Sequence, residues 1–117
     1  MKNQNILKRF YNALQGLKSA WNSERSFRTQ AFITIFVIVV VFFLKASLVW
    51  WAIILLAIGA TLAAELINTG MEYMLDFLHP AHHDQIGRAK DCAAAAVLIL
   101  SITSILIFIA FLISRFS

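Results

Sequence analysis

Long apolar runs alternate with short polar segments along this chain. Between Ala31 and Ala64 the only strongly polar residue is Lys45, with Ser47 beside it. A single helix over this stretch would be about 50 Å long, whereas the hydrocarbon core of a bilayer is about 30 Å thick. We therefore expect two membrane spans that are joined by a tight turn near Lys45 to Ser47.

A third apolar run, 93–113, contains no charged residue and predicts a further span. The small and polar residues around Pro80, the single proline, mark a loop before this run. The second span is expected to continue beyond the membrane boundary into water. The sequence thus predicts one domain, 1–117, with spans over 27–44, 48–76 and 91–113 and a loop over 77–90.

The segment before the first span has the pattern of an amphipathic helix. Its apolar residues recur at steps of three and four: Leu7, Phe10, Leu14, Leu17 and Trp21. This spacing predicts a helix over about 5–22 that lies in the membrane interface, with its basic residues toward lipid phosphates. Packing against a soluble partner is the alternative interpretation of the same pattern.

Composition supports a membrane location for the whole chain. Hydrophobic residues make up 61% of the 117 residues and charged residues only 14%, far from the balance of a soluble domain. The net charge of +4 favours an anionic lipid or substrate at the membrane surface over nucleic acid, because the basic residues form no patch interleaved with aromatics. The predicted fold class is therefore all-α and integral to a membrane.

The basic residues also predict an orientation. Six of the ten lysines and arginines lie in the N-terminal segment that ends at Arg28, and Arg88 and Lys90 lie in the loop between the second and third spans. The positive-inside rule then places the N-terminus and this loop in the cytoplasm and the C-terminus outside. All six acidic residues fall on or near the cytoplasmic side, which indicates a site there.

The cytoplasmic end of the second helix carries a polar face. Glu65, Asn68, Glu72 and Asp76 lie at offsets of 0, 3, 7 and 11, which keeps them within one narrow face. A charged residue inside a span costs a few kcal/mol and by default marks a function. A solvated helix end is the alternative interpretation, which stays open for Asp76.

The residue types on this face suit phosphoryl transfer to a lipid head group. A carboxylate in a low-dielectric interface can accept a hydroxyl proton, which is the role expected of Glu65. Carboxylates nearer to water can hold Mg²⁺, and Glu72 and Glu24 are placed for this. Arg88 and Lys90 can contact phosphate oxygens. Together they supply the groups that phosphoryl transfer needs.

The loop contains residue types that also occur in zinc sites: His79, His82, His83 and Asp84. Two adjacent histidines beside a proline make poor co-ligands, so we expect a solvated loop, with one histidine near a nucleotide. The chain contains no GxxxxGK[ST] sequence and no protein-kinase motif. Any ATP must therefore bind outside the known soluble nucleotide folds.

Three segments resemble motifs of one family. ERSFR at 24–28 is similar to the start of its first span, ELINTGMEYMLD at 65–76 to its signature, and GRAKDCAAAAVL at 87–98 to the start of its third helix. On these residues the chain resembles the prokaryotic diacylglycerol kinases, small integral-membrane lipid kinases that include undecaprenol kinases. Gly70, Met71 and Leu75 depart from the usual signature, which bears on substrate fit more than on chemistry.

The resemblance implies a homotrimer with active sites shared between protomers, in the bacterial inner membrane. It implies that Glu65 is the general base for the lipid hydroxyl and that Glu24 and Glu72 hold the Mg²⁺ of Mg-ATP. The other implied roles are ordering of the site and the nucleotide phosphates by Asn68, Lys90 and Asp91, proximity to ATP for His83, and bordering of the lipid entrance by Trp21, Phe27 and Arg28. Asp76, Asp84 and His79 receive no role.

Two other classes of protein share parts of this pattern. A small multidrug-type proton-coupled transporter is also short and apolar, but it needs its glutamate near the membrane midplane and usually four spans. A structural or regulatory subunit would not require the acidic residues to gather on one side. The resemblance implies an ATP-dependent kinase, and we expect it to convert 1,2-diacylglycerol to phosphatidic acid, with undecaprenol as the alternative acceptor.

Overall fold

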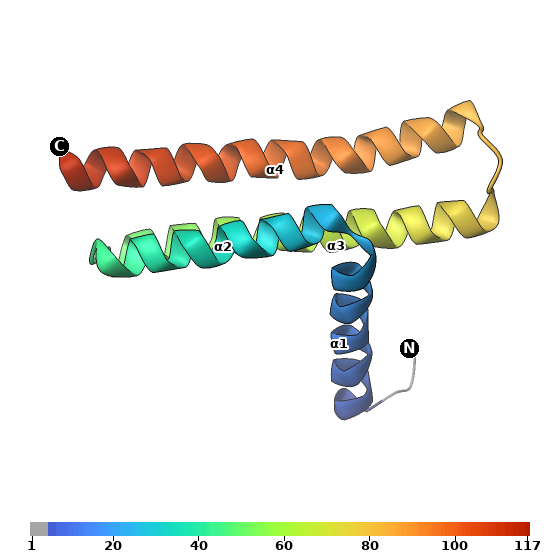
Figure 1. Ribbon diagram of the computed structural model, residues 1–117, viewed down its shortest axis with the longest axis horizontal. Helices are drawn as coiled ribbons and strands as arrows, with labels where there is room; N and C mark the ends of the chain where they lie inside the picture. Colours follow the sequence, from blue (N-terminus) through green and yellow to red (C-terminus); the bar gives the residue numbers. More distant parts are fainter. Residues whose placement is uncertain (1–4) are drawn as a thin grey trace.

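The computed structural model describes residues 5–117 as a chain of helices, and this described part contains no strand. Three of the helices are long and apolar enough to cross a bilayer. The predicted all-α class with three spans is thus confirmed. In chain order the helices are α1 (Ile6–Ser23), α2 (Arg25–Phe43), α3 (Leu48–Leu78) and α4 (Asp84–Phe116) (Figure 1).

The three long helices run side by side in alternating directions, and α1 stands across them near the start of α2 (Figure 1). α3 packs against both α2 and α4. Most side chains of the three spans remain exposed in the single chain. Their apolar surfaces are therefore available to lipid or to other copies of the chain.

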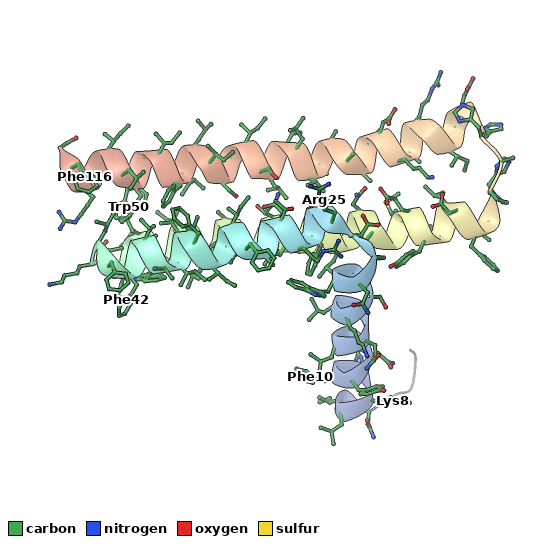
Figure 2. All side chains as sticks on the ribbon, in the orientation of Figure 1. Lys8, Phe10, Arg25, Phe42, Trp50 and Phe116 are labelled. Atoms are coloured by element: carbon green, nitrogen blue, oxygen red, sulfur yellow. The ribbon has the colours of Figure 1, made fainter. Side chains whose placement is uncertain are left out.

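α1 occupies the segment for which the spacing predicts an amphipathic helix. Asn5 caps its first turn, because the Asn5 side chain accepts a hydrogen bond from the backbone N–H of Lys8 at 2.8 Å. Lys8 and Phe10 project from opposite sides of the helix (Figure 2), and Phe10 is 65% exposed. The apolar side of α1 is thus uncovered by the rest of the chain, and its place in the membrane interface stays a prediction.

α2 ends in a Schellman motif, which forms the tight turn predicted near Lys45. The N–H of Lys45 donates to the carbonyl of Phe42 at 3.1 Å, and the N–H of Ala46 donates to Val41 at 3.3 Å. Lys45 adopts φ 54°, in the left-handed region. Ser47 then caps α3, so the chain reverses direction within four residues.

Two substitutions at Lys45 should move stability in opposite directions. Glycine removes the Cβ crowding of the left-handed conformation and should raise the free energy of unfolding by about 1 kcal/mol. Valine should lower it by about 1 kcal/mol, since a branched Cβ adds strain at positive φ. Unfolding in mixed micelles with increasing denaturing detergent measures both. Equal stability of the two variants would contradict this account.

The core of the bundle lies at the end where α2 turns into α3. Val41, Ile54 and Phe111 are buried there, and the Trp50 ring meets the Phe111 ring edge-on at 5.6 Å. Arg115 Nε donates to the carbonyl of Leu44 at 2.8 Å, which satisfies a helix-end carbonyl. Figure 2 shows Phe42, Trp50 and Phe116 gathered at this end.

The loop between α3 and α4 is shorter than predicted. The sequence indicated a loop over 77–90, but α3 continues to Leu78 and α4 already begins at Asp84. His83 caps α4, because its Nδ1 accepts the backbone N–H of Gln85 at 3.1 Å. Asp84 suits the positive end of the helix dipole, and the polar residues that follow are mostly good helix formers. Polarity alone therefore misplaced the helix start.

Candidate active site

Glu65 is buried, and it lies level with the start of α2. The segment from Ser26 to the end of α2 at Phe43 is as long as the segment from the start of α3 at Leu48 to Glu65. Because the tight turn makes the two helices antiparallel neighbours, both residues stand about 26 Å from it. Ser26 Oγ donates a hydrogen bond of 2.6 Å to Glu65 Oε1.

The surroundings of Glu65 suit a carboxylate with a specific task. Its side chain is only 2% exposed, and a buried carboxylate requires a hydrogen-bond donor. Ser26 is that donor. One turn further, Thr69 is 3% exposed and its Oγ1 donates to the Glu65 carbonyl at 2.9 Å. No pattern in the sequence singles out Ser26, although it lies inside the ERSFR segment.

Glu24 stands at the corner between α1 and α2, just outside the span that begins at Arg25. Burial raises the pKa of Glu24, and the nearby carboxylates of Glu72 and Glu65 raise it further, whereas Arg28 lowers it. The structure thus brings the three predicted glutamates of the site together. Two neighbouring carboxylates such as Glu24 and Glu72 favour a cation between them.

Asn68 completes this group with an oxygen that has no hydrogen-bond partner among residues 5–117. Its Nδ2 donates to Glu72 Oε1 at 3.3 Å, while its buried Oδ1 accepts no hydrogen bond from the described residues. Carboxylate and amide oxygens are the ligands that Mg²⁺ takes from proteins. In the described part of the chain no three His, Cys, Asp or Glu residues are grouped as a metal site. Glu24 and Glu72 would therefore supply two ligands, and waters and substrate phosphates the remainder.

The raised pKa of Glu24 predicts a pH effect on stability in metal-free buffer. The folded state binds a proton at Glu24 more tightly than the unfolded chain, so ionising this carboxyl costs stability. That cost appears as the pH rises from the ordinary glutamate pKa through the raised one. The stability difference between wild type and Glu24→Gln, measured by unfolding in micelles, should change across this window. A constant difference from pH 4 to pH 8, taken as about the accessible range, would contradict it.

Lys90 reaches the polar face of α3 across the loop. Its Nζ forms an ion pair with Asp76 Oδ1, which gives Asp76 a partner that the sequence did not reveal. A pocket of about 220 Å³ between the ends of α3 and α4 is lined by Asp76, His79, His83 and Lys90, among others. The His83 ring lies 5.4 Å from that of His79. Asp91, the next residue of α4, is exposed.

The two halves of the predicted site are separate in the single chain. Asp76 lies about three helical turns beyond Glu65 on α3, which places the pocket that contains Lys90 and His83 about 16 Å further along the helix. Glu72 lies between them. The polar face of α3 therefore connects a buried carboxylate with the pocket at the end of the bundle.

The three residues expected at the lipid entrance have different surroundings. Phe27 is buried, with 6% of its side chain exposed. Arg28 donates from a terminal guanidinium nitrogen to the Trp21 carbonyl, and the Trp21 ring lies 5.7 Å from that of Phe32. Arg28 and Trp21 thus join the end of α1 to the start of α2, and the border of a lipid entrance stays a prediction.

Tyr73 fixes α1 against α3. Its hydroxyl donates to the carbonyl of Ser19 at 3.2 Å and also contacts the hydroxyl of Ser23. The end of α1 is therefore held beside Glu72, the neighbour of Tyr73 in the sequence. This contact could not be predicted from sequence spacing, because it joins residues that are 54 positions apart.

Comparison with known proteins identifies the family of the chain. The family model described as prokaryotic diacylglycerol kinase matches residues 11–112. This chain belongs to the prokaryotic diacylglycerol kinase family. It is therefore a lipid kinase that is embedded in a bacterial membrane, as the three motifs and three spans indicated.

Members of the family with different acceptors are about equally similar to this chain. The undecaprenol kinase of Bacillus subtilis is 33% identical over 87% of this chain and 83% of its own length. The diacylglycerol kinase of Helicobacter pylori is 33% identical over 80% of this chain and 73% of its own length. That of Escherichia coli is 27% identical over 95% of this chain and 91% of its own length. Identity thus fixes the family but not the acceptor.

Proposed function

We propose that this lipid kinase transfers the γ-phosphoryl group of Mg-ATP to the free hydroxyl of 1,2-diacylglycerol and forms phosphatidic acid. The observation that carries the proposal is the Glu65 carboxylate, which is 2% exposed and lies level with the start of α2. A base at this depth meets a hydroxyl at the membrane surface. Undecaprenol, which also presents one primary hydroxyl, is the alternative acceptor.

The proposed reaction assigns the proton to Glu65. As the lipid oxygen bonds to the γ-phosphorus, the bond from that phosphorus to the bridging oxygen of ADP breaks, and Glu65 takes the hydroxyl proton. Ser26 orients the carboxylate through its hydrogen bond to one oxygen, and the other oxygen is left for the substrate. General-base assistance of this kind contributes about 10²- to 10⁴-fold.

The other residues of the polar face would hold the nucleotide. Glu24 and Glu72 would bind Mg²⁺, which when present neutralises charge on the phosphate oxygens. Asn68 would order this pair through its bond to Glu72. In this proposal Lys90 contacts the phosphates, Asp91 supports the site from the adjacent position of α4, and His83 lies near ATP.

We further infer a homotrimer in the bacterial plasma membrane, with the N-terminus in the cytoplasm and the C-terminus outside. The excess of basic residues before α2 and around the loop supports this orientation. The exposure of most span side chains supports assembly, since a polar stripe within the hydrocarbon requires a protein cover. In the trimer the active sites would be shared between protomers.

A proton-coupled transporter is the alternative outside the kinases. A transporter would place its glutamate near the membrane midplane. Glu65 instead lies about 26 Å along α3 from the start of this helix at Leu48, which is close to one surface of the membrane. Only a kinase phosphorylates a lipid, so a measurement of lipid phosphorylation distinguishes the two classes of protein.

The experiment measures transfer of labelled γ-phosphate from ATP by the purified protein in mixed micelles. Diacylglycerol, undecaprenol and triacylglycerol are offered separately, with and without Mg²⁺. We expect labelled phosphatidic acid from diacylglycerol only when Mg²⁺ is present. We expect no labelled product from triacylglycerol, which has no free hydroxyl. If the folded protein labels only undecaprenol, the acceptor is undecaprenol and not diacylglycerol. If it labels no lipid, the proposal is overturned.

A further inference from the structure

A groove between the three spans begins one helical turn from Glu65. Gln30 lies four residues after Ser26 on α2, and Thr61 lies four residues before Glu65 on α3. Both line a pocket of about 280 Å³, so the pocket starts about 6 Å from the Ser26–Glu65 pair. The groove leads away from that pair, toward the core at the other end of the bundle.

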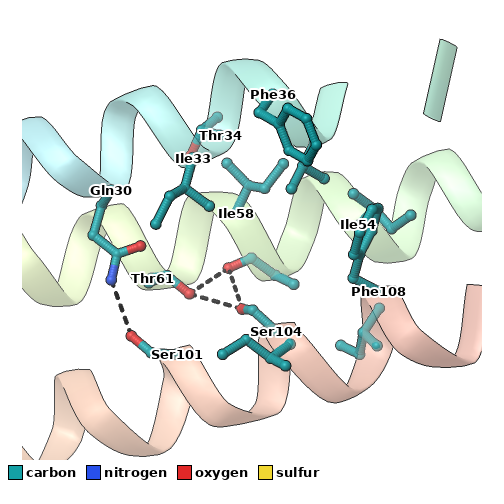
Figure 3. A pocket seen from close by; sticks show the side chains of 14 residues that line it. Gln30, Ile33, Thr34, Phe36, Ile54, Ile58, Thr61, Ser101, Ser104 and Phe108 are labelled. Carbon is teal, nitrogen blue, oxygen red and sulfur yellow. Dashed lines mark hydrogen bonds between the residues drawn. The ribbon is translucent and has the colours of Figure 1, made fainter. Parts of the chain in front are cut away.

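The two ends of the groove differ in polarity. Gln30 and Ser101 stand at the end near Glu65, while Ile54 and Phe108 stand at the other (Figure 3). The rest of the lining is apolar, apart from the polar side chains of Gln30, Thr34, Thr61, Ser101 and Ser104. A ligand that fits must therefore be an oil-like chain with a polar group close to one end.

The chain register brings the polar residues level with one another. Thr61 lies as far before the end of α3 at Leu78 as Ser101 lies after the start of α4 at Asp84. Gln30 Nε2 donates to Ser101 Oγ at 3.1 Å. This bond crosses the mouth of the groove from α2 to α4.

The two polar pairs differ in how far they are satisfied. Thr61 and Ser104 bond to each other at 2.9 Å, and Thr61 also donates to the Ala57 carbonyl at 2.8 Å. Gln30 uses one amide hydrogen on Ser101. Among the bonds of the described residues this leaves the second amide hydrogen of Gln30 and the hydroxyl hydrogen of Ser101 for another acceptor.

We propose that Gln30 and Ser101 are specificity-determining residues that donate to an ester carbonyl of diacylglycerol, whose acyl chain lies in the groove and whose hydroxyl lies at Glu65. This inference rests on the proposed function and adds the basis of acceptor choice. In diacylglycerol both ester groups are attached to glycerol carbons near the one that carries the hydroxyl. One helical turn separates the base from the donors, which matches this spacing. An isoprenoid alcohol has no carbonyl to offer them.

The test compares 1,2-diacylglycerol with 1,2-dialkylglycerol, which keeps the hydroxyl and both chains but lacks the carbonyls. The wild type should prefer the ester lipid by about 2- to 10-fold in kcat/KM, the worth of one hydrogen bond. Gln30→Leu and Ser101→Ala should each lower this ratio toward one by reducing activity on the ester lipid alone. Wild-type discrimination is measured even if a variant fails to fold.

Thr103→Ala is the matched control. Thr103 is an exposed residue on the same helix, bonds to its own helix at the Ile99 carbonyl and lies outside the groove. Its removal should leave the ratio unchanged.

Four results would overturn the inference. If the wild type phosphorylates both lipids equally, or if the ratio survives in both variants, the pair does not read the carbonyl, although the proposed function stands. If both activities fall together and the oligomeric state changes on size exclusion, the groove is an interface between copies of the chain. If the wild type phosphorylates no lipid, the proposed function fails as well.

Discussion

Replacing Glu65 with glutamine should lower kcat for lipid phosphorylation by about 10²- to 10⁴-fold, with little change in the stability of the protein. Glutamine keeps the shape of the side chain and an oxygen that can accept from Ser26, which bonds to Glu65 at 2.6 Å. It cannot accept the proton of the lipid hydroxyl. Initial rates at saturating diacylglycerol and Mg-ATP measure the effect, and unfolding in micelles confirms that the fold is intact.

Ser26→Ala is the informative companion to Glu65→Gln. It removes the donor but leaves the carboxylate, so a positioning role predicts a smaller loss of kcat, about 10-fold, and an altered pH profile. Because the two residues act as a unit, the double variant should be no worse than Glu65→Gln alone. If Glu65→Gln retained a tenth of the wild-type rate, the proton would have to go to another group.

Removing Glu72 should give the second large effect, on the metal requirement. We expect Glu72→Gln to raise the Mg²⁺ concentration for half-maximal activity by about 10- to 100-fold. The physical reason is that Glu24 and Glu72 lie close enough for the charge of Glu72 to raise the pKa of Glu24. A dication relieves this repulsion, and a single carboxylate binds it much less tightly. Activity measured against free Mg²⁺ at fixed Mg-ATP determines the shift.

A control with the same change of charge separates local binding from net charge. Asp84 is 88% exposed, at the start of α4, and its contact with His82 is 3.6 Å long. Asp84→Asn should leave the Mg²⁺ requirement unchanged. If Asp84→Asn and Glu72→Gln shifted the requirement equally, the effect would be one of overall electrostatics, and the assignment of Glu72 would be wrong.

The spans and the polar face could be predicted because each depends on residues that are close in the sequence. Uninterrupted apolar runs reveal three spans whatever their packing, and the spacing from Glu65 to Asp76 places these residues on one face of a helix. The turn at Lys45 followed from the length of the apolar run. In all these cases the helical repeat alone carries the prediction.

The partners of these residues depend on how separate helices are aligned, which the sequence pattern does not give. Ser26 meets Glu65 because the turn between α2 and α3 contains four residues. One more residue in this turn would rotate the polar face of α3 away from Ser26. Gln30 and Ser101 lie 71 positions apart. The start of α4 was misplaced because His83 acts as a cap, a role that depends on backbone geometry.

The length of α3 between Leu48 and Glu65 sets the distance of the Glu65 carboxylate from one end of the membrane span. This segment is a continuous helix of about 26 Å and does not compress, so it fixes the depth of the carboxylate relative to the opposite membrane surface. A thicker bilayer would carry the acceptor hydroxyl beyond Glu65, and a thinner one would hold it short, unless the helices tilt or the lipids deform. We therefore expect the rate to depend on bilayer thickness, so that lipids that never react would help to set it.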